Sequence, residues 1–338
     1  MAEAGVILLM FTIGTEFSIP ELLRVKWVAL AGAPVGICLS IGLAAGTGVF
    51  LGWPWPQGIA VGCIVSVAST MVLMRLLMDR GELASEAGRI MVALTLVEDL
   101  AVVILTILLP SLSPASNADV IQILWRIGKA LFLLIPIVFA GWKIIPRVLA
   151  RVEKTGNDEL AVLLALTICI AVAAITEKLG LSLALGGFVG GLLLGSSRYS
   201  HRFAGKVFPI RDAFVALFFV TVGMLIDPRA LFSNWQLLLV VIGLILAGKF
   251  AIWFVIVRLF GYSAETALRV SVGLTQIGEF SFVLARLSLH SALITEQIYN
   301  AILAASLITI LANALLFKLV KSAPAARPQG TESAELAA

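Results

Sequence analysis

Residues 90–109 read IMVALTLVEDLAVVILTILL, with the acidic pair Glu98-Asp99 near the middle of a predominantly apolar run. About 20 such residues are enough for a helix to span a bilayer. A charged side chain at the centre of a spanning helix costs about 2.5–3.5 kcal/mol on insertion scales, so two adjacent acids require a strong reason. We interpret the pair as an ion or proton site, which is the default role of carboxylates within a membrane. The alternative is a packing role in which a buried lysine or arginine neutralises the pair.

The two acids do not occupy equivalent positions on the predicted helix. Neighbouring helical residues point about 100° apart, because the helix has about 3.6 residues per turn. We therefore expect Glu98 and Asp99 not to face one cavity equally. One acid is expected to hold the ion, and the other to tune or share its charge.

The composition excludes a soluble protein, since 60% of the 338 residues are hydrophobic and only 13% are charged. Apolar segments near the length of a membrane span recur along the chain. The sequence therefore predicts an all-α polytopic membrane protein, with a membrane domain over 1–320 and a disordered polar tail over 321–338. The eleven predicted segments are 4–17, 27–52, 57–79, 87–110, 121–146, 158–177, 180–197, 213–227, 234–259, 265–288 and 296–320.

Lysine and arginine are concentrated in alternate loops. The predicted third loop holds Arg80 and Arg89, and the fifth holds Lys143, Arg147 and Arg151, whereas the second and fourth loops carry no basic residue. The positive-inside rule then places the odd loops and the C-terminus in the cytoplasm and the N-terminus outside. We expect a multi-pass protein of the cell (inner) membrane.

The cysteines and histidines give no sign of a metal or cofactor site. Cys38, Cys63 and Cys169 lie in apolar runs without ligand spacing, so we interpret them as small core residues. His201 and His290 are far apart in the chain. We expect no metal, no cofactor and no nucleic-acid partner.

A short internal repeat is present. Residues 10–14 read MFTIG and residues 219–223 read FVTVG, and each copy is followed by a polar exit with a proline. The first copy exits to the cytoplasm and the second exits outward, which makes the repeats inverted, as is typical of secondary transporters. Segments 158–177 and 180–197 precede the second copy, and nothing precedes the first. By symmetry, we expect two N-terminal helices, roughly 50 residues, to be missing from this chain.

Two corresponding segments carry a polar, helix-breaking patch. The third segment contains Ala68-Ser69-Thr70, and the tenth contains Gln276-Ile277-Gly278-Glu279. Broken helices at matching positions of two repeats indicate a transporter's binding site, because the unwound backbone frees carbonyl groups for a cation. We expect the two breaks to cross near Asp99. The alternative is that Ser69 and Thr70 only bond back to their own helix.

Lys249 is the only base deep in its predicted segment. We expect it to be a partner for Glu279 or for the pair Glu98-Asp99. Glu279, Gln276 and Lys249 are thus the predicted supporting groups around an ion site of Asp99, Glu98, Ser69 and Thr70.

Five motifs in this order resemble the Kef-type monovalent cation:proton antiporters of the CPA2 sodium/hydrogen exchanger superfamily. The resemblance covers nearly the whole chain up to about residue 320. The motifs are GVILLMFTIG at 5–14, AST at 68–70, VEDL at 97–100, LFFVTVGM at 217–224 and QIGEF at 276–280.

The resemblance implies a thirteen-helix fold with two six-helix inverted repeats, a homodimer and an elevator motion. It also implies that Asp99 binds the ion and the proton. The position of Glu98 is Asp in electrogenic members, Asn in electroneutral ones and often Gln in potassium-type members, so Glu98 leaves the stoichiometry open. The first two helices and the nucleotide-binding regulatory domain of Kef proteins have no counterpart here, so ligand gating is not implied.

These observations favour a secondary transporter that exchanges potassium or sodium for protons by alternating access. Two alternatives stay open. An intramembrane enzyme would need a nucleophile or metal ligands near Glu98 and Asp99, and no HExxH or GxSxG motif is present. A transport-inactive, truncated membrane module is the second alternative.

Overall fold

The computed structural model describes residues 7–8, 10–12, 14–15, 27–83, 85–113, 120–178, 183–195, 209–210, 213–214, 216–217, 220, 224 and 234–320. Every long element within these ranges is helical, as expected where each backbone polar group must be satisfied inside its own segment. The elements are η1 (Val28–Gly32), α3 (Ala33–Phe50), α4 (Trp55–Ser66), α5 (Thr70–Asp79), α6 (Glu86–Ser111), α7 (Val120–Glu153), α8 (Asp158–Lys178), α9 (Leu183–Gly195), α12 (Trp235–Gly243), η2 (Leu244–Gly248), α13 (Lys249–Leu259), α14 (Ala264–Gly273), α15 (Glu279–His290) and α16 (Glu296–Leu319).

Several of these helices are membrane spans. In the described part of the chain, four helices are long and apolar enough to cross a bilayer, or five if α6 counts as one span. The chain is therefore a multi-pass membrane protein. Half of predicted segment 4–17 and most of predicted segment 213–227 lie outside the described residues, and so do most of the repeat copy at 219–223 and the tail. The number of eleven spans and the orientation of the termini remain predictions.

Helix α7 corrects one predicted boundary. The segment was expected to end at residue 146 and give way to a basic loop, but α7 continues to Glu153 and carries Lys143 and Arg147 on its surface. Both side chains find partners along the helix: Lys143 Nζ lies 4.3 Å from the centre of the Phe139 ring, and Arg147 donates to the Lys143 carbonyl at 2.5 Å. Long basic side chains can thus extend a helix beyond its apolar run.

The exposure of Cys38 is a second correction. Cys63 and Cys169 are buried, as predicted, but Cys38 is exposed on α3. A membrane helix is as apolar on its lipid-facing surface as on its packed face, so an apolar neighbourhood in the sequence does not distinguish burial from lipid contact.

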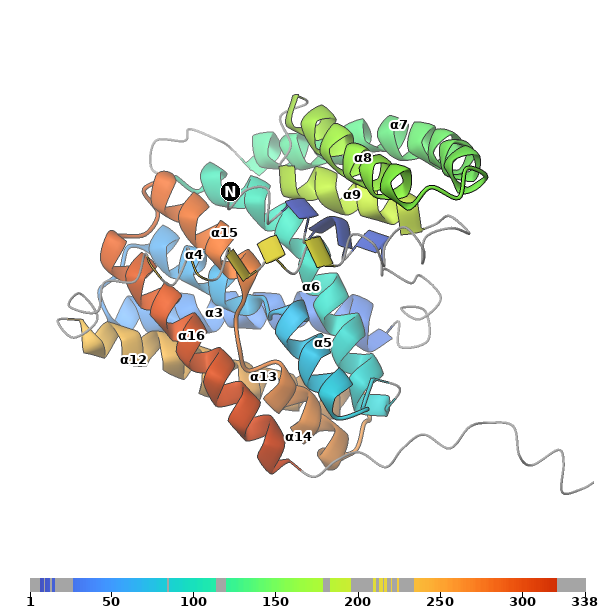
Figure 1. The fold of residues 1–338 in the computed structure, drawn as a ribbon. Coiled ribbons are helices and arrows are strands. Elements are labelled where there is room, and N and C mark those ends of the chain that lie inside the picture. Colours follow the sequence, from blue (N-terminus) through green and yellow to red (C-terminus); the bar gives the residue numbers. More distant parts are fainter. Residues whose placement is uncertain are drawn as a thin grey trace, which may run out of the picture. The chain divides into compact units, whose positions relative to one another are not determined.

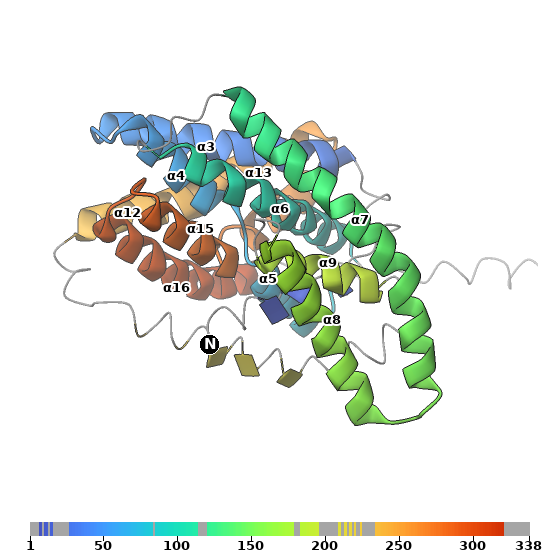
Figure 2. The ribbon, with the colours of Figure 1, turned by 90° about the horizontal axis from the view of Figure 1, so that it is seen from above.

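The chain divides into two compact units. The first comprises residues 1–19, 102–234 and 286–303. Within it, α7 and α8 form a helical hairpin (Figure 2), and α9 packs against both. Gly186 of α9 lies so close to Ala173 and Thr176 of α8 that a Cβ atom would have no space. Small residues allow such close helix contacts in membranes.

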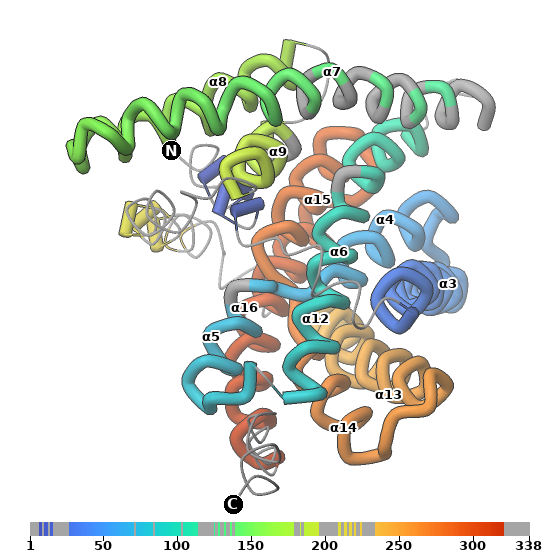
Figure 3. The backbone as a smooth tube through the Cα atoms, turned by 90° about the vertical axis from the view of Figure 1, so that its right-hand side faces the viewer, coloured from blue at the N-terminus to red at the C-terminus, as the bar shows by residue number. Residues whose placement is uncertain are grey.

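The second unit comprises residues 20–101, 235–285 and 304–338. In it, α3 lies along α4 (Figure 1), and the continuous helix formed by α12, η2 and α13 turns back into α14 (Figure 3). Helix α13 also packs on α3, where the ring of Trp253 fills the space above Gly36.

Both predicted helix breaks are confirmed, and both lie in the second unit. The first break is Val67–Ser69, between α4 and α5, and the second is 274–278, between α14 and α15. Val67 and Ser69 have extended backbone conformations, so the chain leaves one helix and enters the next without a continuous hydrogen-bond ladder. Each break exposes the carbonyl end of one half-helix and the N–H end of another.

Candidate functional site

The first break holds both acids of α6. The backbone N–H of Ala68 donates to Glu98 Oε2 at 2.8 Å, and the Thr70 hydroxyl donates to Asp99 Oδ2 at 2.8 Å. The acids were expected not to face one cavity equally, and each reaches this break through a different partner. An extended chain rises about 3.3 Å per residue, so Ala68 and Thr70 are far enough apart to meet two adjacent helical side chains.

The N-terminus of α5 begins at this point. Ser69 is the N-cap residue, and its Oγ accepts a hydrogen bond from the N–H of Val72 at 3.3 Å. A helix N-terminus carries a partial positive charge. Glu98 and Asp99 are therefore placed where the backbone itself favours negative charge.

The two breaks cross at Ser69. Gln276 accepts from the Ser69 N–H at 2.9 Å and donates to the Ser69 carbonyl at 3.0 Å, so a single side-chain amide binds both backbone groups of Ser69. The Ser69 carbonyl also accepts from the Leu73 N–H of α5 at 3.1 Å. The Ser69 hydroxyl donates to Glu279 Oε2 at 2.8 Å. Ser69 thus does more than bond back to its own helix. Gly278 lies against the Ser69 side chain, and a Cβ atom at that position would overlap it.

Lys249 contacts the second break. Its Nζ donates to the Gln276 carbonyl at 3.1 Å, and its charge interacts with that of Glu98. The predicted partner was a carboxylate, but the hydrogen bond goes to a backbone carbonyl that the break frees. Lys249 directly follows the π-helical turn η2, and such turns are frequent at functional sites.

All of these groups are removed from solvent. Glu98, Asp99, Glu279 and Lys249 are each at most 1% exposed. Each of the three carboxylates has one oxygen with a hydrogen bond and one oxygen that finds no partner among the described residues. Three buried acids beside one buried base leave an excess of negative charge, and unpaired buried charge is costly. Such a site gains most from taking up a cation or a proton.

Three further polar residues belong to this region and were missed from the sequence. The Ser281 hydroxyl donates to the Ile64 carbonyl of α4 at 2.7 Å. Ser306 and Asn313 of α16 donate to carbonyls around the second break. The available signal was a polar stripe on α16, since Ser306, Thr309 and Asn313 recur every three to four residues in an apolar helix.

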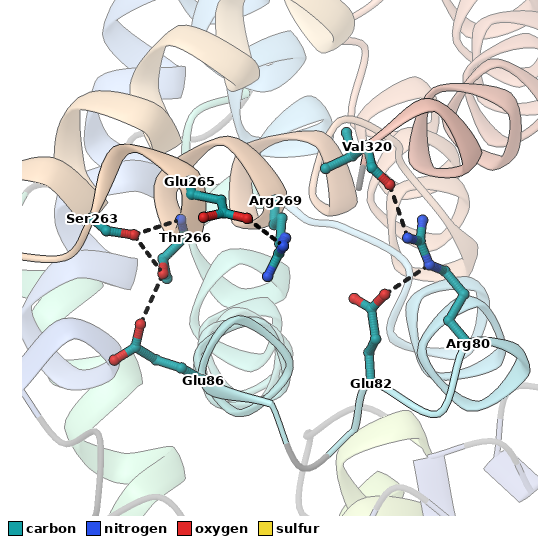
Figure 4. A network of polar contacts seen from close by, with 8 residues as sticks. All are labelled: Arg80, Glu82, Glu86, Ser263, Glu265, Thr266, Arg269 and Val320. Carbon is teal, nitrogen blue, oxygen red and sulfur yellow. Dashed lines mark hydrogen bonds and ion pairs between the residues drawn. The ribbon is translucent and has the colours of Figure 1, made fainter. Parts of the chain in front are cut away.

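A second polar network lies at one end of the same unit (Figure 4). Arg80 forms an ion pair with Glu82 at 2.8 Å and donates to the Val320 carbonyl at 2.8 Å and to the Phe317 carbonyl, which fixes the end of α16. On the other side, the Thr266 hydroxyl of α14 donates to Glu86 at 2.8 Å.

The charge of Glu86 also acts on a tyrosine. Burial, together with this nearby carboxylate, raises the pKa of Tyr262, which lies between α13 and α14. These contacts therefore join the beginning of α6, which carries both acids of the site, to α14, and the end of α5 to the end of α16.

The family model described as "Sodium/hydrogen exchanger, transmembrane" matches residues 1–320. The chain belongs to the sodium/hydrogen exchanger family. This chain is 38% identical over 329 residues to the putative cation/proton antiporter YbaL of Escherichia coli K12, with 95% of this chain and 59% of the relative covered. It is 34% identical over 326 residues to K(+) efflux antiporter 4 of Arabidopsis thaliana, covering 95% of this chain and 55% of the relative. The chain thus spans less than two thirds of the length of these relatives.

A solved structure gives the same fold. The sodium proton antiporter MjNhaP1 from Methanocaldococcus jannaschii matches with a TM-score of 0.72 and 18% identity, over 93% of this chain and 82% of the other chain. The predicted all-α antiporter-like fold and the resemblance to Kef-type antiporters are confirmed by these matches.

Proposed function

We propose that the chain exchanges a monovalent cation for protons across the membrane, with Asp99 as the group that binds either one. The observation that supports this most directly is the environment of Asp99. One of its oxygens accepts from Thr70, the other has no partner among the described residues, and the side chain lies where two broken helices cross. Broken helices at the centre of a transporter are typical binding elements for ions.

Competition at Asp99 provides the coupling. A protonated carboxyl is neutral and does not hold a cation, whereas an ionised one takes a cation with oxygens of Ser69, Thr70 and freed carbonyls completing its shell. Either ligand neutralises the site, and a neutral site crosses the apolar interior at a much smaller cost than a bare charge. Alternating access of the elevator type then moves a cation in one direction and a proton in the other.

Glu98 and Lys249 set the charge of the site during this cycle. Glu98 is bound by the Ala68 N–H, and the charge of Lys249 acts on it. We propose that Glu98 tunes the affinity of Asp99 and that Lys249 offsets one of the remaining negative charges. The number of charges moved per cycle depends on whether Glu98 also takes up a proton.

Potassium is the first cation to test, and sodium the second. A relative that matches along 95% of the chain is named a K(+) efflux antiporter, and the match to a sodium proton antiporter supports the shared fold only. Both ions bind carboxylate and carbonyl oxygens. We further propose that the chain forms a homodimer in the cell membrane. We place the N-terminus outside and the C-terminus in the cytoplasm, because the basic residues are concentrated in the loops on one side.

The proposal is tested with purified protein in liposomes that contain a pH-sensitive dye. Addition of potassium or sodium should release protons from the lumen, while choline should not. Exchange should fall as the pH is lowered, because protonated Asp99 no longer takes a cation. If the folded 338-residue chain shows no cation-dependent proton movement at any pH, the proposal is wrong and the transport-inactive membrane module is the better description.

A further inference from the structure

The polar stripe of α16 is the strongest feature that the site described above does not use. Ser306, Thr309 and Asn313 all have completely buried side chains. Residues three, four and seven positions apart lie on one face of a helix. The face is therefore polar in the middle of a membrane span, where each polar group needs a partner.

Two of the three side chains bind the second break. Asn313 Nδ2 donates to the Val272 carbonyl, lies 3.2 Å from the Thr275 hydroxyl oxygen and lies 3.5 Å from the Gly273 carbonyl. The Ser306 hydroxyl donates to the Ile277 carbonyl at 3.2 Å. Helix α16 thus supplies donors to carbonyls at both ends of the unwound stretch.

These carbonyls lie where α14 ends, at Gly273, and the Val272 carbonyl also accepts from the Thr275 N–H at 3.2 Å and from the Thr275 hydroxyl at 2.7 Å. The last four carbonyls of a helix have no partner within the helix. Leaving a buried acceptor without a donor costs more than an average hydrogen bond contributes. Asn313 and Ser306 are the donors that reach this stretch from α16, and they bind its backbone to that helix.

The path of this stretch decides where Gln276 and Glu279 point. Gln276 lies between the Asn313 and Ser306 contacts, and its side chain reaches Ser69 at 2.9 and 3.0 Å. Glu279 follows directly and accepts from the Ser69 hydroxyl at 2.8 Å. A displacement of the backbone here would therefore move two groups of the crossing at once.

We propose that Asn313 is a positioning residue for cation exchange, with Ser306 as a weaker second support. It holds the second break in the conformation that directs Gln276 and Glu279 to Ser69, and it does not bind the ion itself. The effect of Asn313 on transport rests on the proposed function. Its effect on the backbone order of residues 272–280 does not.

Three isosteric or nearly isosteric variants test this proposal. Asn313→Leu removes the donor to the break, and Ser306→Ala removes one hydroxyl. Thr309→Val is the matched control, since Thr309 is equally buried on the same face but donates only to the Ser306 carbonyl of its own helix, at 3.1 Å.

Two measurements are made on each variant. Hydrogen–deuterium exchange reports the order of the peptide 272–280 in the full-length protein, whether or not it transports. The concentration dependence of potassium-driven exchange in liposomes gives the KM for the cation and the maximal rate. The wild-type protein and Asp99→Asn are measured beside them, so that a failure of the proposed function is seen separately.

We expect Asn313→Leu to exchange amide hydrogens of the peptide 272–280 faster than Thr309→Val, and to raise the KM about tenfold, as for the loss of one well-formed buried hydrogen bond. Ser306→Ala should also speed amide exchange and raise the KM, by a smaller factor. If Asn313→Leu does not accumulate as folded protein, the comparison of Ser306→Ala with Thr309→Val tests the proposal in its place. Equal amide exchange in the variants and the control would overturn the structural part. Faster amide exchange with an unchanged KM would overturn the positioning role.

Discussion

The two helix breaks look alike in outline, but they bind the charged side chains nearest to them through opposite backbone groups. At the first break the chain offers N–H groups, which bind Glu98 through Ala68 and Gln276 through Ser69. At the second break the chain offers carbonyls, which accept from Lys249 and Ser306. The first break is thus suited to negative partners and the second to positive or donating ones.

This difference shows how a crossing of broken helices can hold charges of both signs. The N-terminal end of α5 is a positive pole and the C-terminal end of α14 is a negative one. Acids come to the first pole from α6, and a base comes to the second from α13. Gln276 joins the two breaks. Its neutral side-chain amide both accepts from and donates to the backbone of Ser69.

The largest expected effect comes from the acid at the first break. Asp99→Asn keeps an oxygen for the Thr70 hydroxyl but cannot titrate or carry charge. Proton-coupled cation exchange should fall to the level of empty liposomes, with little change in the amount of folded protein, as measured with the dye assay and by size-exclusion chromatography. Coupled exchange that survives in this variant would show that the ion site lies elsewhere.

A double-mutant cycle tests whether the charge of Glu98 at the first break interacts with the charge of Lys249 at the second. Lys249→Met leaves the buried charge of Glu98 without a cation and should lower the free energy of unfolding by about 3 kcal/mol, measured by SDS titration in mixed micelles. Glu98→Gln alone should be milder and should change the pH dependence of exchange. Adding Glu98→Gln to Lys249→Met should restore part of the lost stability, whereas strictly additive losses would mean that the two charges do not interact.

The closeness of the two breaks is tested at Gly278. In Gly278→Ala the new Cβ would overlap the Ser69 side chain, so the crossing must open. We expect a loss of about 1–3 kcal/mol in the same unfolding assay, together with slower exchange. Gly42→Ala on α3 is the control, because nothing lies within 4 Å of its new Cβ. If Gly278→Ala and Gly42→Ala change the unfolding free energy and the exchange rate equally, Gly278 is not a close contact between the breaks.

The smallest expected effect concerns the carbonyl side of the first break. Ser281→Ala leaves the Ile64 carbonyl without its hydroxyl donor and should cost about 1 kcal/mol of unfolding free energy. Ser271→Ala is the matched control, since Ser271 is also buried but donates to Ala267 within its own helix. If the two substitutions lower the unfolding free energy equally, Ser281 does not specifically stabilise the break.

Much of the candidate site followed from single residues that do not belong in an apolar helix. Glu98 and Asp99 are conspicuous because acids are expensive in a membrane span, and the patches around Ser69 and Gln276 are conspicuous because they interrupt helices. Lys249 was found in the same way. Ser281 and Asn313 were not, because serine and asparagine in a membrane helix usually have several local explanations.

The sequence by itself determined that this chain is an all-helical membrane protein, where its helices break and which charged groups lie inside the membrane. These features depend on local composition, and local composition is what hydropathy and helix-breaking residues report. Only the tertiary structure decided that Ser69 pairs with Gln276 across 207 residues, that Lys249 binds a carbonyl and that Asn313 donates to the Val272 carbonyl. Those contacts depend on the rotation and relative height of packed helices, and an apolar helix surface facing lipid or protein carries no pattern that specifies either one.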